Sequence, residues 1–149
     1  MRTALVIVLL ASLSLVGACK KSGGDSQAKH LHIESGMQGV PAIEVEVTKS
    51  GSGTEANNGD HVYIHYVGRL QSGTKFDSSR DRGSPIDFDV GARQMIVGWD
   101  LIAAAMRVGD RWKCTIPPAL AYGPGGNPPV IPRNATLVFD MELMSVDSK

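Results

Sequence analysis

A strict alternation of apolar and polar residues constrains the fold of this chain more than any other feature. Ile43, Val45 and Val47 are separated by polar side chains, and residues 62–66, 112–116 and 137–143 show a similar alternation. A period of two places the apolar residues on one face of a β-strand, which is typical of an antiparallel sheet with one solvated face. Residues 94–106 instead space their apolar residues as a helix does, before a turn at residues 109–110. The sequence therefore predicts an α+β domain in which one short helix packs on a sheet of four to five strands.

The N-terminal segment has the layout of an export signal. Arg2 is followed by an almost wholly apolar run from Ala4 to Val16, shorter than the ~20 residues of a membrane-spanning helix. Residues 16–19 resemble the lipobox of bacterial lipoprotein signals, in which the cysteine becomes the lipidated first residue. We therefore expect residues 1–18 to be a cleaved signal peptide and Cys19 to carry a lipid that anchors the chain to a membrane. Ordinary signal cleavage, with Cys19 as a bystander, is the alternative.

The composition changes again near residue 42. Residues 19–41 are rich in Lys, Ser, Gly, Gln and His, which predicts a flexible tether, whereas residues 42–149 carry the alternating segments. His30 and His32 have no cysteine or carboxylate pair near them in the sequence, so we interpret them as solvated tether residues. The predicted organisation is a signal peptide, a lipid-anchored tether and one folded domain.

Charge and motifs exclude several classes of protein. The chain has 15 Lys and Arg against 15 Asp and Glu, which leaves no basic excess for binding nucleic acid. The G-x-S-x-G, H-E-x-x-H, C-x-x-C and Walker motifs do not occur, so hydrolase, metalloprotease, thioredoxin-like and NTPase functions lose their usual support.

His61 and His65 are roughly 13 Å apart on an extended strand and cannot share a metal ion. Cys114 falls on the same face of its predicted strand as Trp112 and Ile116, so we expect it to be a buried, inert thiol. We expect neither a metal nor a cofactor.

The distribution of aromatic residues is unusual. The chain has only eight Phe, Tyr and Trp residues, and six of them fall at inward strand positions, strand boundaries, the helix start or a loop. Such a set is compatible with an ordinary core or with an aromatic pocket. These six are Tyr66, Phe76, Phe88, Trp99, Tyr122 and Phe139.

A series of short motifs, in order and register, closely resembles the FKBP-type peptidyl-prolyl cis-trans isomerases. The resemblance covers residues 43–146, and the signal segment is similar to that of a bacterial lipoprotein form of this family. The blocks that carry it are residues 62–68, 73–80, 85–91, 95–100, 106–110, 116–118, 121–123, 131–132 and 135–140.

The resemblance implies a curled antiparallel sheet of four to six strands wrapped around one short α-helix, with a proline-binding pocket between them. By position, Trp99 would form the pocket floor, while the Ile96 N–H and the Tyr122 hydroxyl would bind substrate carbonyls. Asp77, held by Arg82, would present its carboxylate near the twisting amide. The remaining substrate-binding positions implied are Tyr66, Phe76, Ile86, Phe88, Met95, Val130, Ile131 and Phe139.

Three positions in or near the implied pocket depart from the family's commonest residues. Ile86 stands where an aromatic wall residue is usual, Leu120 where a tyrosine is frequent, and Asn127 where a histidine is frequent. The five residues most closely tied to activity in the resemblance are present: Tyr66, Asp77, Trp99, Tyr122 and Phe139.

Two functions of different class follow. The first is an isomerase that acts on X-Pro bonds of exported or envelope proteins, located in the bacterial cell envelope and facing the periplasm or the cell exterior. The second is a non-catalytic peptide-binding or chaperone module on the cell envelope, and a surface lipoprotein that uses the domain as a scaffold is a weaker third reading. The resemblance also implies binding of macrolides of the tacrolimus type, and the short tether favours a monomer.

Overall fold

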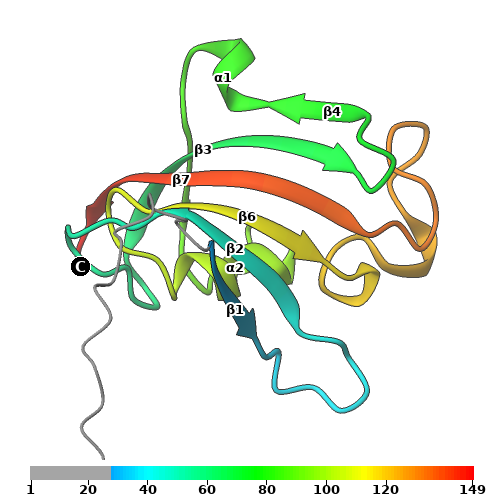
Figure 1. Ribbon diagram of the computed structural model, residues 1–149, viewed down its shortest axis with the longest axis horizontal. Helices are drawn as coiled ribbons and strands as arrows, with labels where there is room; N and C mark the ends of the chain where they lie inside the picture. Colours follow the sequence, from blue (N-terminus) through cyan, green and yellow to red (C-terminus); the bar gives the residue numbers. More distant parts are fainter. Residues whose placement is uncertain (1–27) are drawn as a thin grey trace, which may run out of the picture.

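The computed structural model describes residues 28–149, which form a curved antiparallel sheet over one main helix (Figure 1). The seven strands of this described part follow the order β1-β2-β6-β7-β3-β4, and β5 also pairs with β3. The strands are β1 (Lys29–Ile33), β2 (Ile43–Lys49), β3 (His61–Leu70), β4 (Lys75–Ser78), β5 (Ile86–Asp89), β6 (Arg111–Ile116) and β7 (Leu137–Asp147).

Two α-helices and two short 3-10 helices complete the described part of the chain. The main helix, α2 (Val97–Ala103), buries Trp99, Ile102 and Ala103 beneath the sheet. The other three are α1 (Ser79–Arg82) and the 3-10 helices η1 (Pro118–Leu120) and η2 (Gly123–Gly125). The long β7 strand pairs with β3 on one side and with β6 on the other, so it forms the centre of the sheet.

The structure confirms the predicted α+β fold with a curled antiparallel sheet. The four stretches that alternate in the sequence lie in β2, β3, β6 and β7, with their apolar residues turned toward α2. The helix is shorter than residues 94–106, because Gln94 to Ile96 approach it as an irregular segment. At the other end, Ala105 and Met106 donate hydrogen bonds to carbonyls only three residues back, which tightens the last turn.

The structure departs from the predicted tether between residues 28 and 41. Lys29–Ile33 form β1, which extends the sheet beyond β2, with Leu31 opposite Val45 and Ile33 opposite Ile43. Leu31 and Ile33 are half-buried against the core, and this packing is why a stretch of tether-like composition forms a strand. This extra strand also brings the sheet to seven strands where four to six were expected.

The N-terminal predictions lie beyond what the structure describes. The signal peptide at residues 1–18, the lipidated Cys19 and the first part of the tether all fall outside residues 28–149. Among the residues that the structure does describe, no helix is long and apolar enough to cross a membrane.

The core lies between the concave face of the sheet and α2. Ile43, Ile64, Ile102, Met141 and Leu143 are among its fully buried side chains. As predicted, the thiol of Cys114 is also buried there, and its burial raises the pKa of the thiol well above the usual range. A neutral, enclosed thiol is a poor nucleophile, so Cys114 is a packing residue.

Candidate active site

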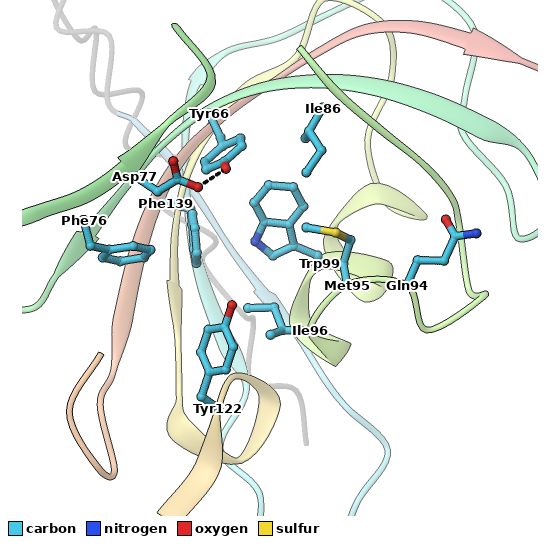
Figure 2. A pocket seen from close by; sticks show the side chains of 10 residues that line it. All are labelled: Tyr66, Phe76, Asp77, Ile86, Gln94, Met95, Ile96, Trp99, Tyr122 and Phe139. Carbon is cyan, nitrogen blue, oxygen red and sulfur yellow. Dashed lines mark hydrogen bonds between the residues drawn. The ribbon is translucent and has the colours of Figure 1, made fainter. Parts of the chain in front are cut away.

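A cavity of about 420 Å³ opens between the N-terminal end of α2 and the β3, β4 and β7 part of the sheet. Its volume lies within the range of small-ligand pockets, and most of its lining side chains are apolar or aromatic. Figure 2 shows these side chains gathered around the ring of Trp99. The ten lining residues are Tyr66, Phe76, Asp77, Ile86, Gln94, Met95, Ile96, Trp99, Tyr122 and Phe139.

Trp99 forms the floor of this cavity and is held by other aromatic rings. Its indole meets the rings of Tyr66 and Phe139 edge to face, with centroids 4.8 and 5.3 Å away. Phe76 in turn meets Phe139 edge to face at 5.6 Å. Such edge-to-face pairs fix ring orientation, so the floor and wall of the cavity are preformed. The Trp99 Nε1 atom is buried and has no hydrogen-bond partner within residues 28–149.

A polar cluster lies at the rim, where β4 leads into α1. The Tyr66 hydroxyl donates to Asp77 Oδ2, and the Arg82 guanidinium pairs with Asp77 Oδ1 (Figure 2 shows the first of these bonds). The Ser78 backbone N–H donates to Asp77 Oδ1 at 2.8 Å, and Arg82 Nη2 donates to the Tyr66 hydroxyl at 3.0 Å. The predicted contact between Arg82 and Asp77 is therefore present.

These contacts decide the charge state of the cluster. Burial alone would raise the pKa of Asp77, but the hydrogen bonds from Tyr66, Arg82 and Ser78 outweigh it and lower this pKa below its ordinary value. Burial and the Asp77 carboxylate both raise the pKa of Tyr66, although Arg82 opposes them. At neutral pH the cluster therefore contains a carboxylate, a protonated phenol and a guanidinium.

Local sequence explains how the rim is built. Ser78 caps α1 by accepting a hydrogen bond from the Asp81 N–H at 3.2 Å, and Gly83 ends the helix in the left-handed conformation with φ 73°. The single turn between them places Arg82 beside Asp77. A β-strand that ends in a capped turn thus brings a carboxylate and a guanidinium five residues apart into contact.

The opposite side of the cavity carries hydrogen-bond donors. The Tyr122 hydroxyl points toward the centre of the group of side chains in Figure 2, and the residue is about two-fifths exposed. Ile96 immediately precedes α2, and its N–H has no hydrogen-bond partner in the part of the chain that the structure describes. The site therefore offers donors on one side and, on the other, a carboxylate that is paired with a guanidinium.

Nine of the predicted site residues line the cavity, and four do not. Phe88 was predicted as a wall, but it is only 1% exposed and packs behind Trp99, with ring centroids 5.8 Å apart. Arg82 stands outside the lining and contacts it through Asp77. In the predicted flap, Val130 is exposed, whereas Ile131 is buried and exchanges two backbone hydrogen bonds with Asn127. Neither residue belongs to the lining of the cavity.

One lining residue, Gln94, was not predicted. It lies directly before Met95, and its side-chain oxygen accepts a hydrogen bond from the Asp89 N–H at 3.0 Å. In Figure 2 its amide group points away from Trp99, so the residue contributes mainly its aliphatic carbons to the lining of the cavity. The only signal in the sequence was its position next to a predicted site residue.

The histidines near the sheet take structural roles. His61 lies between Asp87 and Asp89 on the outer face of the sheet, whereas His65 contacts the Ser79 hydroxyl. Nowhere in residues 28–149 do three His, Cys, Asp or Glu side chains come together in a way that could hold a metal ion.

Comparison with known proteins gives a consistent assignment. The family model for FKBP-type peptidyl-prolyl cis-trans isomerase matches residues 52–144. FK506-binding protein 1 of Debaryomyces hansenii is 48% identical over 112 residues, which cover 74% of this chain and all of that protein. The protein of the same name in Saccharomyces cerevisiae is 47% identical over 106 residues, covering 70% of this chain and 93% of the relative. Peptidyl-prolyl cis-trans isomerase FKBP15-2 of Arabidopsis thaliana is 38% identical over 149 residues, covering all of this chain and 83% of the relative.

Proposed function

This chain belongs to the FKBP-type peptidyl-prolyl cis-trans isomerases, and we propose that its aromatic cavity holds the proline of an X-Pro bond while the amide twists. The observation that carries this proposal is the preformed floor of Trp99 with the Asp77 carboxylate fixed at the rim. In this proposal the proline ring lies on the indole, and Phe139 and Phe76 form one wall. Ile86, Met95 and Ile96 close the other side.

The reaction needs no nucleophile because no bond breaks. Amide resonance sets a barrier of about 18 to 20 kcal/mol, and uncatalysed X-Pro isomerisation takes tens to hundreds of seconds. Rotation localises the nitrogen lone pair and reduces the charge separation of the amide. A cavity that excludes water therefore favours the twisted amide over the planar one. The Tyr122 hydroxyl and the Ile96 N–H then bind the substrate carbonyls, and the Asp77 carboxylate lies near the twisting bond.

The required stabilisation is modest. Shortening a step of tens of seconds to about ten milliseconds takes roughly 5 kcal/mol, since each tenfold corresponds to about 1.4 kcal/mol. Two or three hydrogen bonds that strengthen in the twisted state, together with desolvation, are of this size. The site therefore has enough groups for the reaction.

The test compares the wild-type protein with two variants in the cis-to-trans rate of an X-Pro peptide. Tyr122→Phe removes one donor and Asp77→Ala removes the carboxylate, and we expect both to lower kcat/KM by about tenfold or more. Tyr63→Phe is the matched control for the phenol, because Tyr63 lies on the outer face of the sheet, away from the cavity. Unchanged rates in Tyr122→Phe and Asp77→Ala would refute the assignment of the site. Peptide binding without acceleration would favour the alternative, a non-catalytic binding or chaperone module.

We also propose that the mature protein is a lipoprotein of a bacterial cell envelope that acts on exported proteins. The support is the apolar run before a V-G-A-C sequence, in which Cys19 would carry the lipid. Mass spectrometry of the protein after expression in a bacterium tests this directly. A diacylated N-terminal Cys19, absent in Cys19→Ser, supports the anchor, whereas cleavage without added mass supports an ordinary secretion signal.

The names of the relatives suggest a ligand. FK506-binding protein 1 of two yeasts is similar to this chain, and we propose that macrolides of the tacrolimus type occupy the same cavity. Trp99 lies on the floor, so binding should change its fluorescence while inhibiting the isomerase. Trp99→Phe keeps an aromatic floor and serves as the control, because it removes the fluorescent ring while Trp112 remains. A fluorescence change that persists in Trp99→Phe would place the ligand elsewhere.

A further inference from the structure

A buried hydroxyl connects the two elements that hold the Asp77 carboxylate. Ser79 is the first residue of α1 and is 0% exposed. Its Oγ accepts a hydrogen bond from the Tyr66 N–H at 2.7 Å, and it lies 2.9 Å from His65 Nδ1 and 3.3 Å from the Tyr66 carbonyl oxygen. The lining of the cavity does not include Ser79, and the site described above does not use it.

The hydroxyl takes the place of a backbone acceptor in the sheet. The β3–β4 ladder pairs Gly68 with Asp77 and Val67 with Ser78, and it ends there because the chain turns into α1. Tyr66 is the next residue of β3, and its N–H would be left without a partner on this side. A buried, unpaired N–H is costly, so Ser79 Oγ satisfies it and attaches the start of α1 to β3.

This attachment does not depend on the proton of the neighbouring imidazole. A serine hydroxyl has one proton to donate, and here two acceptors are within reach. When His65 Nδ1 is unprotonated, the hydroxyl donates to it. When His65 Nδ1 carries a proton, the imidazole donates to Ser79 Oγ and the hydroxyl turns to the Tyr66 carbonyl. The Tyr66 N–H bond persists in both arrangements.

We propose that Ser79 is a positioning residue for Asp77. The carboxylate is held by the Tyr66 hydroxyl from β3 and by the Arg82 guanidinium from α1. Ser79 fixes the distance between these elements, because it begins α1 and is bonded to the backbone of Tyr66 itself. Removing its hydroxyl leaves each donor in the chain but lets the two move apart. This inference rests on the proposed function, in which the Asp77 carboxylate acts on the twisting amide.

The test is a double-mutant cycle of Ser79→Ala and Asp77→Asn in the full chain, read out as kcat/KM on an X-Pro peptide. We expect Ser79→Ala alone to lower kcat/KM about five- to tenfold, mainly through kcat, because the misplaced group acts on the twisted state. In the Asp77→Asn background the same substitution should change kcat/KM less than twofold. The melting temperature should fall with Ser79→Ala in both backgrounds, because the unpaired Tyr66 N–H does not depend on Asp77.

Ser78→Ala is the matched control. Ser78 is an adjacent buried serine that caps α1, and alanine keeps the backbone N–H that binds Asp77. It should lower stability with a smaller effect on kcat/KM than Ser79→Ala. If Ser79→Ala does not fold, Ser79→Cys enters the same cycle, since its thiol is similar in size and a weaker acceptor.

The outcomes separate this inference from the function it rests on. If Asp77→Asn lowers kcat/KM but Ser79→Ala leaves it within twofold, Ser79 has no positioning role. An equal loss from Ser79→Ala with and without the carboxylate would show a general structural effect and would also overturn the inference. If Asp77→Asn itself has no effect, the role of Asp77 fails, and the positioning role of Ser79 fails with it.

Discussion

The two ends of the β3–β7 strand pair have the same alternating pattern but enclose different interiors. At one end Ile64 lies opposite Leu143, and both side chains are fully buried in an aliphatic core. At the other end Gly68 lies opposite Phe139, which borders the cavity. A Cβ on Gly68 would lie 2.7 Å from Phe76 Cζ and 2.9 Å from Phe139 Cε1, so a side chain there would displace both rings.

The difference shows how one sheet supports both stability and a site. Aliphatic side chains such as Ile64 and Leu143 are fully buried at the first end, whereas the missing side chain at Gly68 lets two aromatic rings approach the sheet at the other. The rings of Phe76 and Phe139 border the cavity without filling it. Substitutions at the aliphatic end should therefore change the free energy of unfolding, and those at the aromatic end should change the activity.

The largest effect on stability is expected from Leu143→Ala. The side chain is fully buried, so its truncation leaves a cavity and should lower the free energy of unfolding by about 2 to 5 kcal/mol. Urea denaturation measures this loss, and kcat/KM of the folded protein should stay within twofold. Met144→Ala is the control, because Met144 is exposed on the next position of β7. A large fall in kcat/KM at temperatures where Leu143→Ala is folded would remove the distinction between the two ends.

Gly68→Ala should reverse this pattern. The added methyl group must displace Phe76 and Phe139, which overpacks the site and costs about 1 to 3 kcal/mol of stability. The displaced rings belong to the cavity wall, so kcat/KM should fall several-fold, more than in Leu143→Ala. The comparison uses the same peptide assay and denaturation curves. Full activity in Gly68→Ala would mean that the rings are not a required part of the wall.

Sequence alternation predicted which residues point inward at both ends, but not what they enclose. Tyr66 and Phe139 were expected on the inner face, and they lie there. Phe88 lay outside the alternating stretches, and the resemblance assigned it to the pocket wall. Its ring lies behind Trp99 because the depth of a side chain depends on how α2 packs against the curved sheet, which is a tertiary property.

Two other features depended on contacts distant in the sequence. Leu31 and Ile33 are too few to signal a strand in a polar segment, and β1 forms because β2 offers an edge and an apolar face. Gln94 reaches the cavity from an irregular segment, where no periodicity predicts the direction of a side chain. The contact between Arg82 and Asp77, by contrast, is local and was predictable from family motifs.

A change of pH should have a smaller effect on stability, through His61 on the outer face of the sheet. His61 Nδ1 lies 2.8 Å from Asp89 Oδ1 and its Nε2 lies 3.1 Å from Asp87 Oδ2. The Asp89 hydrogen bond, partly opposed by desolvation and supported by Asp87, raises the pKa of His61 above 6.5. The stability that protonated His61 adds is therefore complete below about pH 6.5 and is lost as the pH rises through the raised pKa.

Denaturation curves between pH 5 and 9 for the wild-type protein and His61→Asn measure this contribution. The difference in the free energy of unfolding between them should narrow with rising pH. Activity should show no matching change, because His61 lies on the opposite face of the sheet from the cavity. A difference that is constant across this range would contradict the role of the His61 proton.

The smallest expected effect is on the isomerisation rate itself, which should be nearly flat between about pH 6 and 8. The reaction moves no proton, the lowered pKa of Asp77 keeps this group a carboxylate, and the raised pKa of Tyr66 keeps its hydroxyl protonated. A bell-shaped profile of kcat/KM with a limb near the pKa of histidine would instead require a titrating group at the site. Repeating the profile with His65→Phe and His61→Asn would then identify which histidine couples the aromatic end of the sheet to pH.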